Sequence, residues 1–244
     1  MVLEVKGLTK KFKNFTAVDG ISFSVNEGEI LGLLGENGAG KTTALRMIAT
    51  MLQPSAGTAI VNGHDVNKDP AGVRGSIGIL FGGDVGIYDR LTARENIMYF
   101  AQLGGLSKKQ ANKNIEKLIK DFEMDSYIDR VAGKFSRGMK QKVSIARSIV
   151  HDPKVMLFDE PCTGLDVSAT RSVQRFILNC KKDNKAVILS SHSMYEVEKL
   201  CDRVAIIHKG KIVEVGTIPE LKAKYQNDDL EEIFIQLIGG ESNE

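Results

Sequence analysis

The sequence predicts an α/β protein with a mixed sheet, and three observations carry that expectation. Short, almost wholly apolar runs stand at residues 29–35, 154–160 and 185–191, the pattern of strands buried on both faces of a parallel sheet. Other runs alternate between apolar and polar residues, as half-exposed antiparallel strands do. A glycine-rich loop follows the first buried run and leads into a segment of good helix formers.

Length and composition narrow the class of protein. A chain of 244 residues can bury about 70 to 75% of its unfolded surface as one compact unit. The formal net charge of +2 gives no polybasic field, so nucleic acid is not expected as a partner. The N-terminus lacks an apolar signal core and no long apolar run occurs, so we expect a cytoplasmic chain that reaches a membrane only through another protein. Cys162, Cys180 and Cys201 form no CxxC pair, so we expect neither disulfides nor zinc.

Four alternating runs are expected to form antiparallel strands. Two of them contain dipeptides that favour tight hairpin turns, Asn62-Gly63 and Lys209-Gly210. The four runs are residues 3–12, 17–25, 58–66 and 204–215.

A helical region is expected between the first and second buried runs. Over residues 107–122 the apolar side chains recur on one helical face, with lysines opposite that we interpret as a solvated surface. This pattern predicts a helical lobe from about residue 91 to 150. A charged tail with a helical stretch over residues 229–238 closes the chain.

Residues 35–42, GENGAGKT, match the phosphate-loop pattern GxxxxGK[ST] in full. The glycines let successive backbone N–H groups face one anion, and the helix that follows adds its positive dipole end. Lys41 can reach the β and γ phosphates, and the Thr42 hydroxyl can ligate Mg²⁺, with Thr43 behind it. The predicted cradle consists of Gly35, Glu36, Asn37, Gly38, Ala39, Gly40, Lys41, Thr42 and Thr43.

Acidic residues end the second buried run. Asp159 can hold Mg²⁺ through water, and we expect Glu160 to point the other way along the pleat, toward an attacking water. Pro161 ends the strand there, which argues against two carboxylates that merely cap it. His192 follows the third buried run and becomes a candidate partner of the γ-phosphate or its water.

Taken in order, these motifs resemble the ATP-binding cassette ATPases over nearly the whole chain. Residues 135–142, FSRGMKQK, are similar to that family's signature, residues 157–161 to Walker B, and residues 163–166, TGLD, to the D-loop. The resemblance implies a P-loop NTPase core with a mixed sheet, an antiparallel β subdomain and a helical signature subdomain. It places the nucleotide-binding domain at residues 1–216 and a short extension at 217–244.

The resemblance also implies roles for particular residues. ATP with Mg²⁺ would lie between the phosphate loop of one copy and the signature of a second copy, so each chain would contribute half of the residues of each site. Ser136, the Gly138 amide and Asp166 would act across that seam, and Phe12 would stack on adenine. The expected catalytic groups are Lys41, Glu160 and His192, and the expected metal ligands are Thr42 and Asp159.

The sequence departs from the family at three positions. Gly82 stands where a glutamine usually contacts Mg²⁺, and losing such a preorganised contact costs about 3 kcal/mol in transition-state stabilisation. Either a water or Asp84 would then compensate, or turnover would be slow. Arg137 and Met139 replace the usual glycine and glutamine of the signature, which leaves only the backbone role to be carried over there.

Residues 80–97, the signature and the tail resemble the cassette subunits of two-component sodium-extruding exporters. This implies an ATP hydrolase, dimeric on ATP, at the cytoplasmic face of a membrane permease that selects the cargo. An exporter of drugs or lipids is an alternative. A cassette acting on ribosomes or DNA is disfavoured, because such proteins usually have tandem cassettes or an inserted coiled coil. A GTP switch is disfavoured because no NKxD motif occurs.

Overall fold

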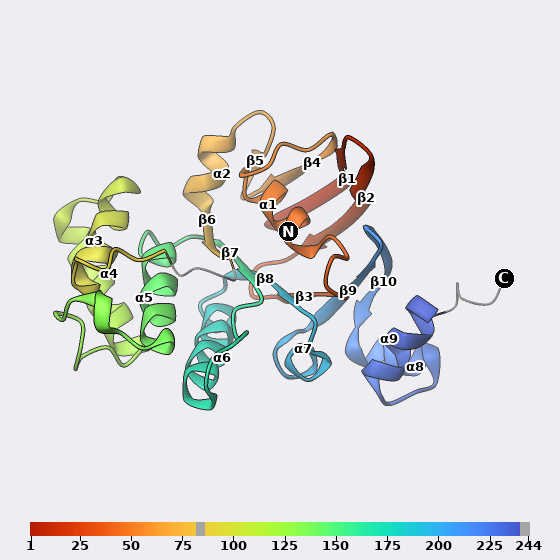
Figure 1. The fold of residues 1–244 in the computed structure, drawn as a ribbon. Helices are drawn as coiled ribbons and strands as arrows, with labels where there is room; N and C mark the ends of the chain where they lie inside the picture. The colour runs from red at the N-terminus through yellow and green to blue at the C-terminus, as the bar shows by residue number, and fades with distance from the viewer. Residues whose placement is uncertain (82–85, 240–244) are drawn as a thin grey trace.

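The computed structural model describes residues 1–81 and 86–239. A six-stranded sheet crosses the middle of the molecule, with a smaller antiparallel sheet on one side and helices on the other (Figure 1). The expected α/β fold with a mixed sheet is confirmed. In spatial order the large sheet consists of β10 (Lys211–Thr217), β9 (Arg203–His208), β3 (Ile30–Leu34), β8 (Ala186–Ser191), β7 (Val155–Asp159) and β6 (Ile77–Leu80).

The three short apolar runs form the centre of the large sheet. β3, β7 and β8 run parallel to one another, and every residue in them is buried. Their predicted burial on both faces is therefore confirmed. Because parallel strands end at the same edge, the segments after Leu34, Asp159 and Ser191 emerge side by side.

The small sheet is antiparallel, as its alternating sequence predicts. Both predicted two-residue turns are present: Asn62-Gly63 joins β4 to β5, and Lys209-Gly210 joins β9 to β10, with positive φ at all four residues. In spatial order this sheet consists of β2 (Phe15–Val25), β1 (Leu3–Phe12), β4 (Ala56–Val61) and β5 (His64–Asp65). Helix α1 (Lys41–Ile48) packs in the apolar core that the two sheets share.

Two details of the sheets differ from the prediction. The hairpin of residues 204–215 is antiparallel within itself, but β9 also pairs in parallel with β3 and so belongs to the large sheet. Strand β6 and the short helix α2 (Pro70–Ser76) were not predicted. In the sequence, β6 is only four residues long and is soon followed by the glycine-rich residues 82–86, which obscure its apolar pattern.

Three helices project as a group from one end of the large sheet (Figure 1). They are α3 (Ala93–Leu103), α4 (Lys108–Asp121) and α5 (Arg137–Ile149). A capping box at Thr92 begins α3, and the Ser107 hydroxyl caps α4. Ile115, Leu118 and Ile119 are buried on α4, which confirms the predicted helical face. A short 3-10 helix (Ala132–Lys134) precedes α5.

The remaining helices pack on the large sheet away from the small sheet. Helix α6 (Val167–Lys182) joins the same apolar cluster as the projecting helices, while α8 (Ile218–Tyr225) and α9 (Leu230–Gly239) pack against α7 (Met194–Leu200), β3 and β9. The helical stretch predicted for the tail is confirmed. Within residues 1–81 and 86–239, no helix combines the length and apolar character that crossing a bilayer requires.

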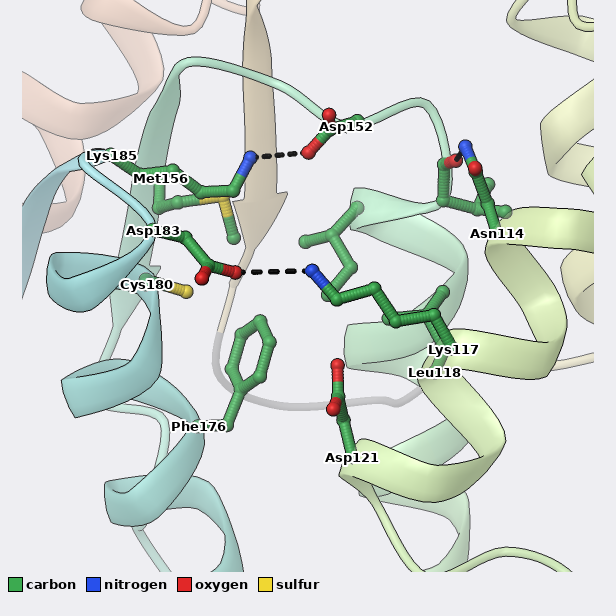
Figure 2. Close-up of a pocket in the computed structure, with 12 residues that line it drawn as sticks. Asn114, Lys117, Leu118, Asp121, Asp152, Met156, Phe176, Cys180, Asp183 and Lys185 are labelled. Atoms are coloured by element: carbon green, nitrogen blue, oxygen red, sulfur yellow. Dashed lines mark hydrogen bonds and ion pairs between the residues drawn. The ribbon is translucent and has the colours of Figure 1, made fainter. Parts of the chain in front are cut away.

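A small pocket marks where α4 meets the core (Figure 2). Leu118, Met156 and Phe176 lie in its apolar wall. Two ion pairs cross its rim, Lys117 Nζ to Asp183 Oδ2 at 3.1 Å and Lys185 Nζ to Asp152 Oδ1 at 2.5 Å. Met156 lies near the start of β7 and Asp159 at its end, so this pocket lies toward the other edge of the sheet from the segments described next.

Candidate functional site

The loop after β3 is shaped by glycines that touch main chain. A Cβ at Gly35 would stand 2.4 Å from the Ile207 carbonyl oxygen, and one at Gly40 would stand 2.6 Å from the Ala17 carbonyl oxygen. Gly40 also has φ of 110°, a conformation that side chains rarely adopt. Gly210, at the β9–β10 turn, packs on the same Ala17 carbonyl, because its Cβ would lie 2.9 Å from that oxygen. Three segments of the chain therefore meet at one main-chain oxygen.

The loop ends at the first residue of α1. Gly40 is the N-cap and offers no side-chain acceptor to the first-turn N–H groups. Gly38, with φ of 85°, and the neighbouring Glu36 and Asn37 are exposed, whereas Ala39 is buried. Free helix N–H groups together with the dipole make this point a binding site for an anion such as phosphate.

The Lys41 side chain lies within the loop and is 4% exposed. Its Nζ donates to the Gly35 carbonyl oxygen at 2.6 Å and to the Glu36 carbonyl oxygen at 3.1 Å. The same nitrogen stands 3.5 Å from Glu160 Oε1. The ammonium group therefore connects the loop to the carboxylate at the end of β7.

Thr42 and Asp159 meet across 117 residues of sequence. The Thr42 hydroxyl donates to Asp159 Oδ2 at 2.7 Å, and the Ser190 hydroxyl donates to Oδ1. Asp159 is 5% exposed. Thr43 lies beside Thr42 in the wall of a pocket around the phosphate loop, which we call the phosphate-loop pocket. A carboxylate and a hydroxyl oxygen are hard ligands that suit Mg²⁺, which takes its other ligands from phosphate and water. Ser190 was not predicted, because nothing in its own strand indicates which neighbour it meets.

Glu160 stands one residue beyond β7 and has φ of 48°. The pleat alternation used to predict its direction therefore does not apply, since the backbone has already left the strand. Its N–H donates to the Ser190 carbonyl oxygen at 3.1 Å, and its Oε2 accepts from the Thr163 hydroxyl at 3.3 Å. This backbone turn aims the side chain at Lys41 and His192.

Partial burial raises the pKa of Glu160, but the hydrogen bond with His192 and the charges of His192 and Lys41 outweigh it, so the pKa lies below its ordinary value. The carboxylate is therefore ionised at neutral pH. His192 Nδ1 lies 3.2 Å from Glu160 Oε1, and half of the imidazole side chain is exposed. An ionised carboxylate with a half-exposed histidine beside it can accept a proton from a water and orient that water.

Two exposed aromatic side chains also line the phosphate-loop pocket. Phe12 and Phe15 pair across the β1–β2 hairpin, are 47% and 62% exposed, and line the pocket with the phosphate loop. Exposed aromatic faces at such a position suit a purine ring. Phe12 was predicted and Phe15 was not. Phe15 could have been predicted from a tight hairpin at residues 13–14, because a two-residue turn between two strands places Phe15 opposite Phe12.

The residues predicted to act toward a second copy lie apart from this pocket. Ser136 is exposed and caps α5 through the Met139 N–H at 3.2 Å. Gly138 is buried so closely that its Cβ would lie 2.9 Å from Ala169 Cβ and 3.8 Å from Asp166 Oδ2. Asp166 caps α6 through the Ala169 N–H at 2.8 Å. Ser136, Gly138 and Asp166 thus lie close together, and none of them lines the pocket of the phosphate loop.

Arg137 and Gln141 add contacts that the motifs did not indicate. Arg137 Nη2 donates to the Thr163 carbonyl oxygen at 3.2 Å, and Gln141 Nε2 donates to the Pro161 carbonyl oxygen at 3.1 Å. Both line a second pocket that includes Thr42, Asp159 and Glu160. Met139 packs on the apolar cluster of the projecting helices. The predictions for Gly82 and Asp84 lie outside the described residues.

Comparison with known proteins gives consistent results. The profile of the ABC transporter family matches residues 18–163. The chain is 48% identical to the ABC transporter ATP-binding protein NatA of Bacillus subtilis, over 92% of each chain. It is 38% identical to the doxorubicin resistance ATP-binding protein DrrA of Mycobacterium tuberculosis, over 91% of this chain and 67% of that one. A solved ATP-binding subunit of an ABC transporter superposes with a TM-score of 0.88 at 28% identity, over 97% of this chain and 99% of the other.

Proposed function

The chain belongs to the ABC transporter family as an ATP-binding subunit, and on that premise we propose that it hydrolyses ATP to drive export through a separate membrane permease. One observation carries this proposal. The phosphate loop with Lys41, the Thr42–Asp159 pair and the Glu160–His192 pair converge at one edge of the sheet. We take residues 1–216 as the nucleotide-binding domain and residues 217–244 as an extension.

The site supports in-line attack by water on the γ-phosphate. Lys41 and the first-turn N–H groups of α1 bind the phosphate oxygens, and Glu160 takes the proton of the water that His192 orients. Thr42 and Asp159 would hold Mg²⁺, which neutralises charge on the phosphates when bound. Phe12 and Phe15 hold the base. The role of Glu160 requires an ionised carboxylate, which its lowered pKa provides at neutral pH.

A second copy completes the site in this proposal. Ser136 is exposed at the start of α5, whose N-terminal turn carries the Ser136 hydroxyl and the Gly138 N–H beside Asp166. These groups suit a phosphate anion, yet they do not line the chain's own phosphate-loop pocket. Two copies arranged head to tail would place each signature against the other's nucleotide.

The permease partner is supported by a groove between β6 and the projecting helices. Its wall includes Ile77, Phe100 and Leu103, with Arg74 and Arg147 among the polar residues. Leu103 is 66% exposed, and Arg147 lies over the Phe100 ring at 4.6 Å. An apolar groove with cationic edges suits a protein segment. We place the permease there, and we propose that the chain lies at the cytoplasmic face of the membrane, as the family of transporter ATP-binding subunits suggests.

For the cargo we propose Na⁺. The support is the resemblance to sodium-extruding exporters together with the 48% identity to NatA. The 38% identity to DrrA favours drug export as the second candidate. The cargo would be selected in the permease, so the two candidates are separated by co-expressing the chain with its permease and comparing efflux of Na⁺ and of doxorubicin.

The ATPase proposal is tested with the purified chain and Glu160→Gln. We expect hydrolysis to rise more steeply than linearly with protein concentration, and Glu160→Gln to bind ATP as the native chain does while hydrolysing it ~10²–10⁴-fold more slowly. The variant should also accumulate as a dimer with ATP and Mg²⁺ in analytical ultracentrifugation. Full activity at dilutions where the chain is monomeric would refute the shared site, and unchanged turnover in Glu160→Gln would refute the assigned base.

A further inference from the structure

The turn that carries His192 is held by a ring of hydrogen bonds. Ser191 ends β8 and is 2% exposed, and its Oγ accepts from the Ser193 N–H at 3.1 Å. The Ser193 hydroxyl caps α7 by accepting from the Glu196 N–H at 3.3 Å. The ring closes through the Glu196 carboxylate, whose Oε2 accepts from the Ser191 hydroxyl at 2.7 Å. His192 is the residue between the two serines.

Glu196 has an acidic side chain that is buried. It is 7% exposed, whereas glutamates are seldom fully buried. Its Oε1 is buried and has no hydrogen-bond partner among the described residues. A buried carboxylate is costly, so its position calls for an explanation beyond packing.

The same carboxylate also lies near the segment that carries Glu160. Cys162 lies two residues after Glu160, and burial together with the neighbouring Glu196 raises the pKa of its thiol. The Glu196 side chain therefore lies near both the segment after β7 and the turn after β8. Those two segments hold the two members of the Glu160–His192 pair.

We propose that Glu196 is the residue that positions His192 for the reaction: its carboxylate holds the Ser191–Ser193 turn so that the imidazole faces Glu160. The proposal rests on the proposed ATPase function but concerns a residue that does not touch the nucleotide pocket. Half of the His192 side chain is exposed, so few packing contacts could hold it otherwise. Without the acceptor, the buried Ser191 hydroxyl must rotate to another partner, and the turn is no longer fixed.

Histidine NMR on the full chain tests the proposal without nucleotide. The chain has four histidines, so each imidazole can be assigned by substitution. We expect Glu196→Ala to shift the His192 signals and to abolish their response to Glu160→Gln, while the signals of His64, His151 and His208 stay in place. Glu196→Gln keeps an acceptor for Ser191 and should restore the native His192 signals. Unchanged His192 signals in Glu196→Ala would overturn the proposal.

A second variant protects the test against misfolding. If Glu196→Ala shifts all four histidines, Ser191→Ala replaces it, because this smaller change breaks the same ring. Shifted His192 signals in Ser191→Ala with the other three unchanged would support the proposal. Native His192 signals there would overturn it.

Hydrolysis provides the functional readout. We expect Glu196→Ala to lower kcat ~10-fold or more with KM within ~3-fold, and to add nothing further in a His192→Ala background. Multiplying effects in the double variant would show that Glu196 acts independently, against the proposal. If the native chain does not hydrolyse ATP, the proposed function fails, while the NMR result still decides whether Glu196 positions His192.

Discussion

Replacing Gly40 with alanine tests whether main-chain contact shapes the phosphate loop. The added Cβ would stand 2.6 Å from the Ala17 carbonyl oxygen, closer than Cβ atoms are found to main-chain oxygens. It would also force alanine into φ of 110°. The carbonyl belongs to β2 and cannot rotate away as a flexible side chain could. Relief therefore requires the loop to move away from the small sheet.

The expected cost has two parts. A left-handed conformation costs a non-glycine residue ~1–2 kcal/mol, and overpacking against immobile neighbours costs a further ~1–3 kcal/mol. Gly40→Ala should therefore lose about 2 to 5 kcal/mol. For a chain of this size 1 kcal/mol corresponds to about 2 to 4 °C in Tm, so the melting temperature should fall by roughly 4 to 20 °C. Nucleotide binding, measured by calorimetry, should be lost with it.

Two matched glycines separate the contributions. Gly38 has φ of 85° with nothing within 4 Å of its Cβ position, so Gly38→Ala should show the conformational cost alone, ~1–2 kcal/mol. Gly75, exposed in α2, has neither a positive φ nor a neighbour, so Gly75→Ala should gain up to about 1 kcal/mol. If Gly40→Ala and Gly38→Ala melt within about 1 °C of each other, the contact with Ala17 does not shape the loop and the reasoning is wrong.

Three further predictions follow from the site and its surroundings. The pKa of Glu160 is lowered from 4.5, so the stability from its contacts is complete above that pH and is lost as the pH falls through the lowered value. The free energy of unfolding in urea should therefore differ between the native chain and Glu160→Gln by a constant amount from about pH 8 to about pH 5, and by less below that. A difference that already shrinks near pH 6 would contradict this. Phe15→Ala should weaken binding of a fluorescent ATP analogue ~5-fold or more, since an aromatic contact contributes about 1 kcal/mol, and should leave binding of inorganic triphosphate unchanged; equal losses for both would place Phe15 away from the base. Asn96 is fully buried; its Oδ1 accepts from the Tyr88 N–H at 2.8 Å and its Nδ2 donates to the Tyr88 carbonyl oxygen at 3.1 Å. Asn96→Ala should therefore lower the free energy of unfolding by about 2 to 4 kcal/mol. A loss under about 1 kcal/mol would show that other groups replace these bonds.

The central strands and the phosphate loop could be predicted because their signals are local. An unbroken apolar run such as that of β7 indicates burial on both faces, and GxxxxGK[ST] specifies its own turn and helix. The Asn62-Gly63 and Lys209-Gly210 turns follow from the residues themselves. The burial pattern of α4 likewise appears directly in the spacing of its apolar residues.

What could not be predicted depends on contacts between distant segments. Nothing in residues 203–208 shows that β9 would also pair with β3, because an alternating strand suits either sheet. Ser190 meets Asp159 across 31 residues. Glu196 meets the Ser191 hydroxyl only five residues away, but this bond depends on the shape of the turn around His192, which the residues alone did not indicate. The direction of Glu160 was predicted from the pleat and depended instead on a single positive φ.

The meeting of Gly40 and Gly210 on the Ala17 carbonyl has a consequence for how this site can diversify. The β1–β2 hairpin, which carries Phe12 and Phe15, is positioned against the phosphate loop by main-chain contacts at Ala17. The side chains of Phe12 and Phe15 take no part in these contacts. If the chain acts as proposed, preference among nucleobases and placement of the γ-phosphate would therefore be separable traits. Libraries randomised at Phe12 and Phe15 would then change base preference while the main-chain contacts of the phosphate loop at Ala17 are kept.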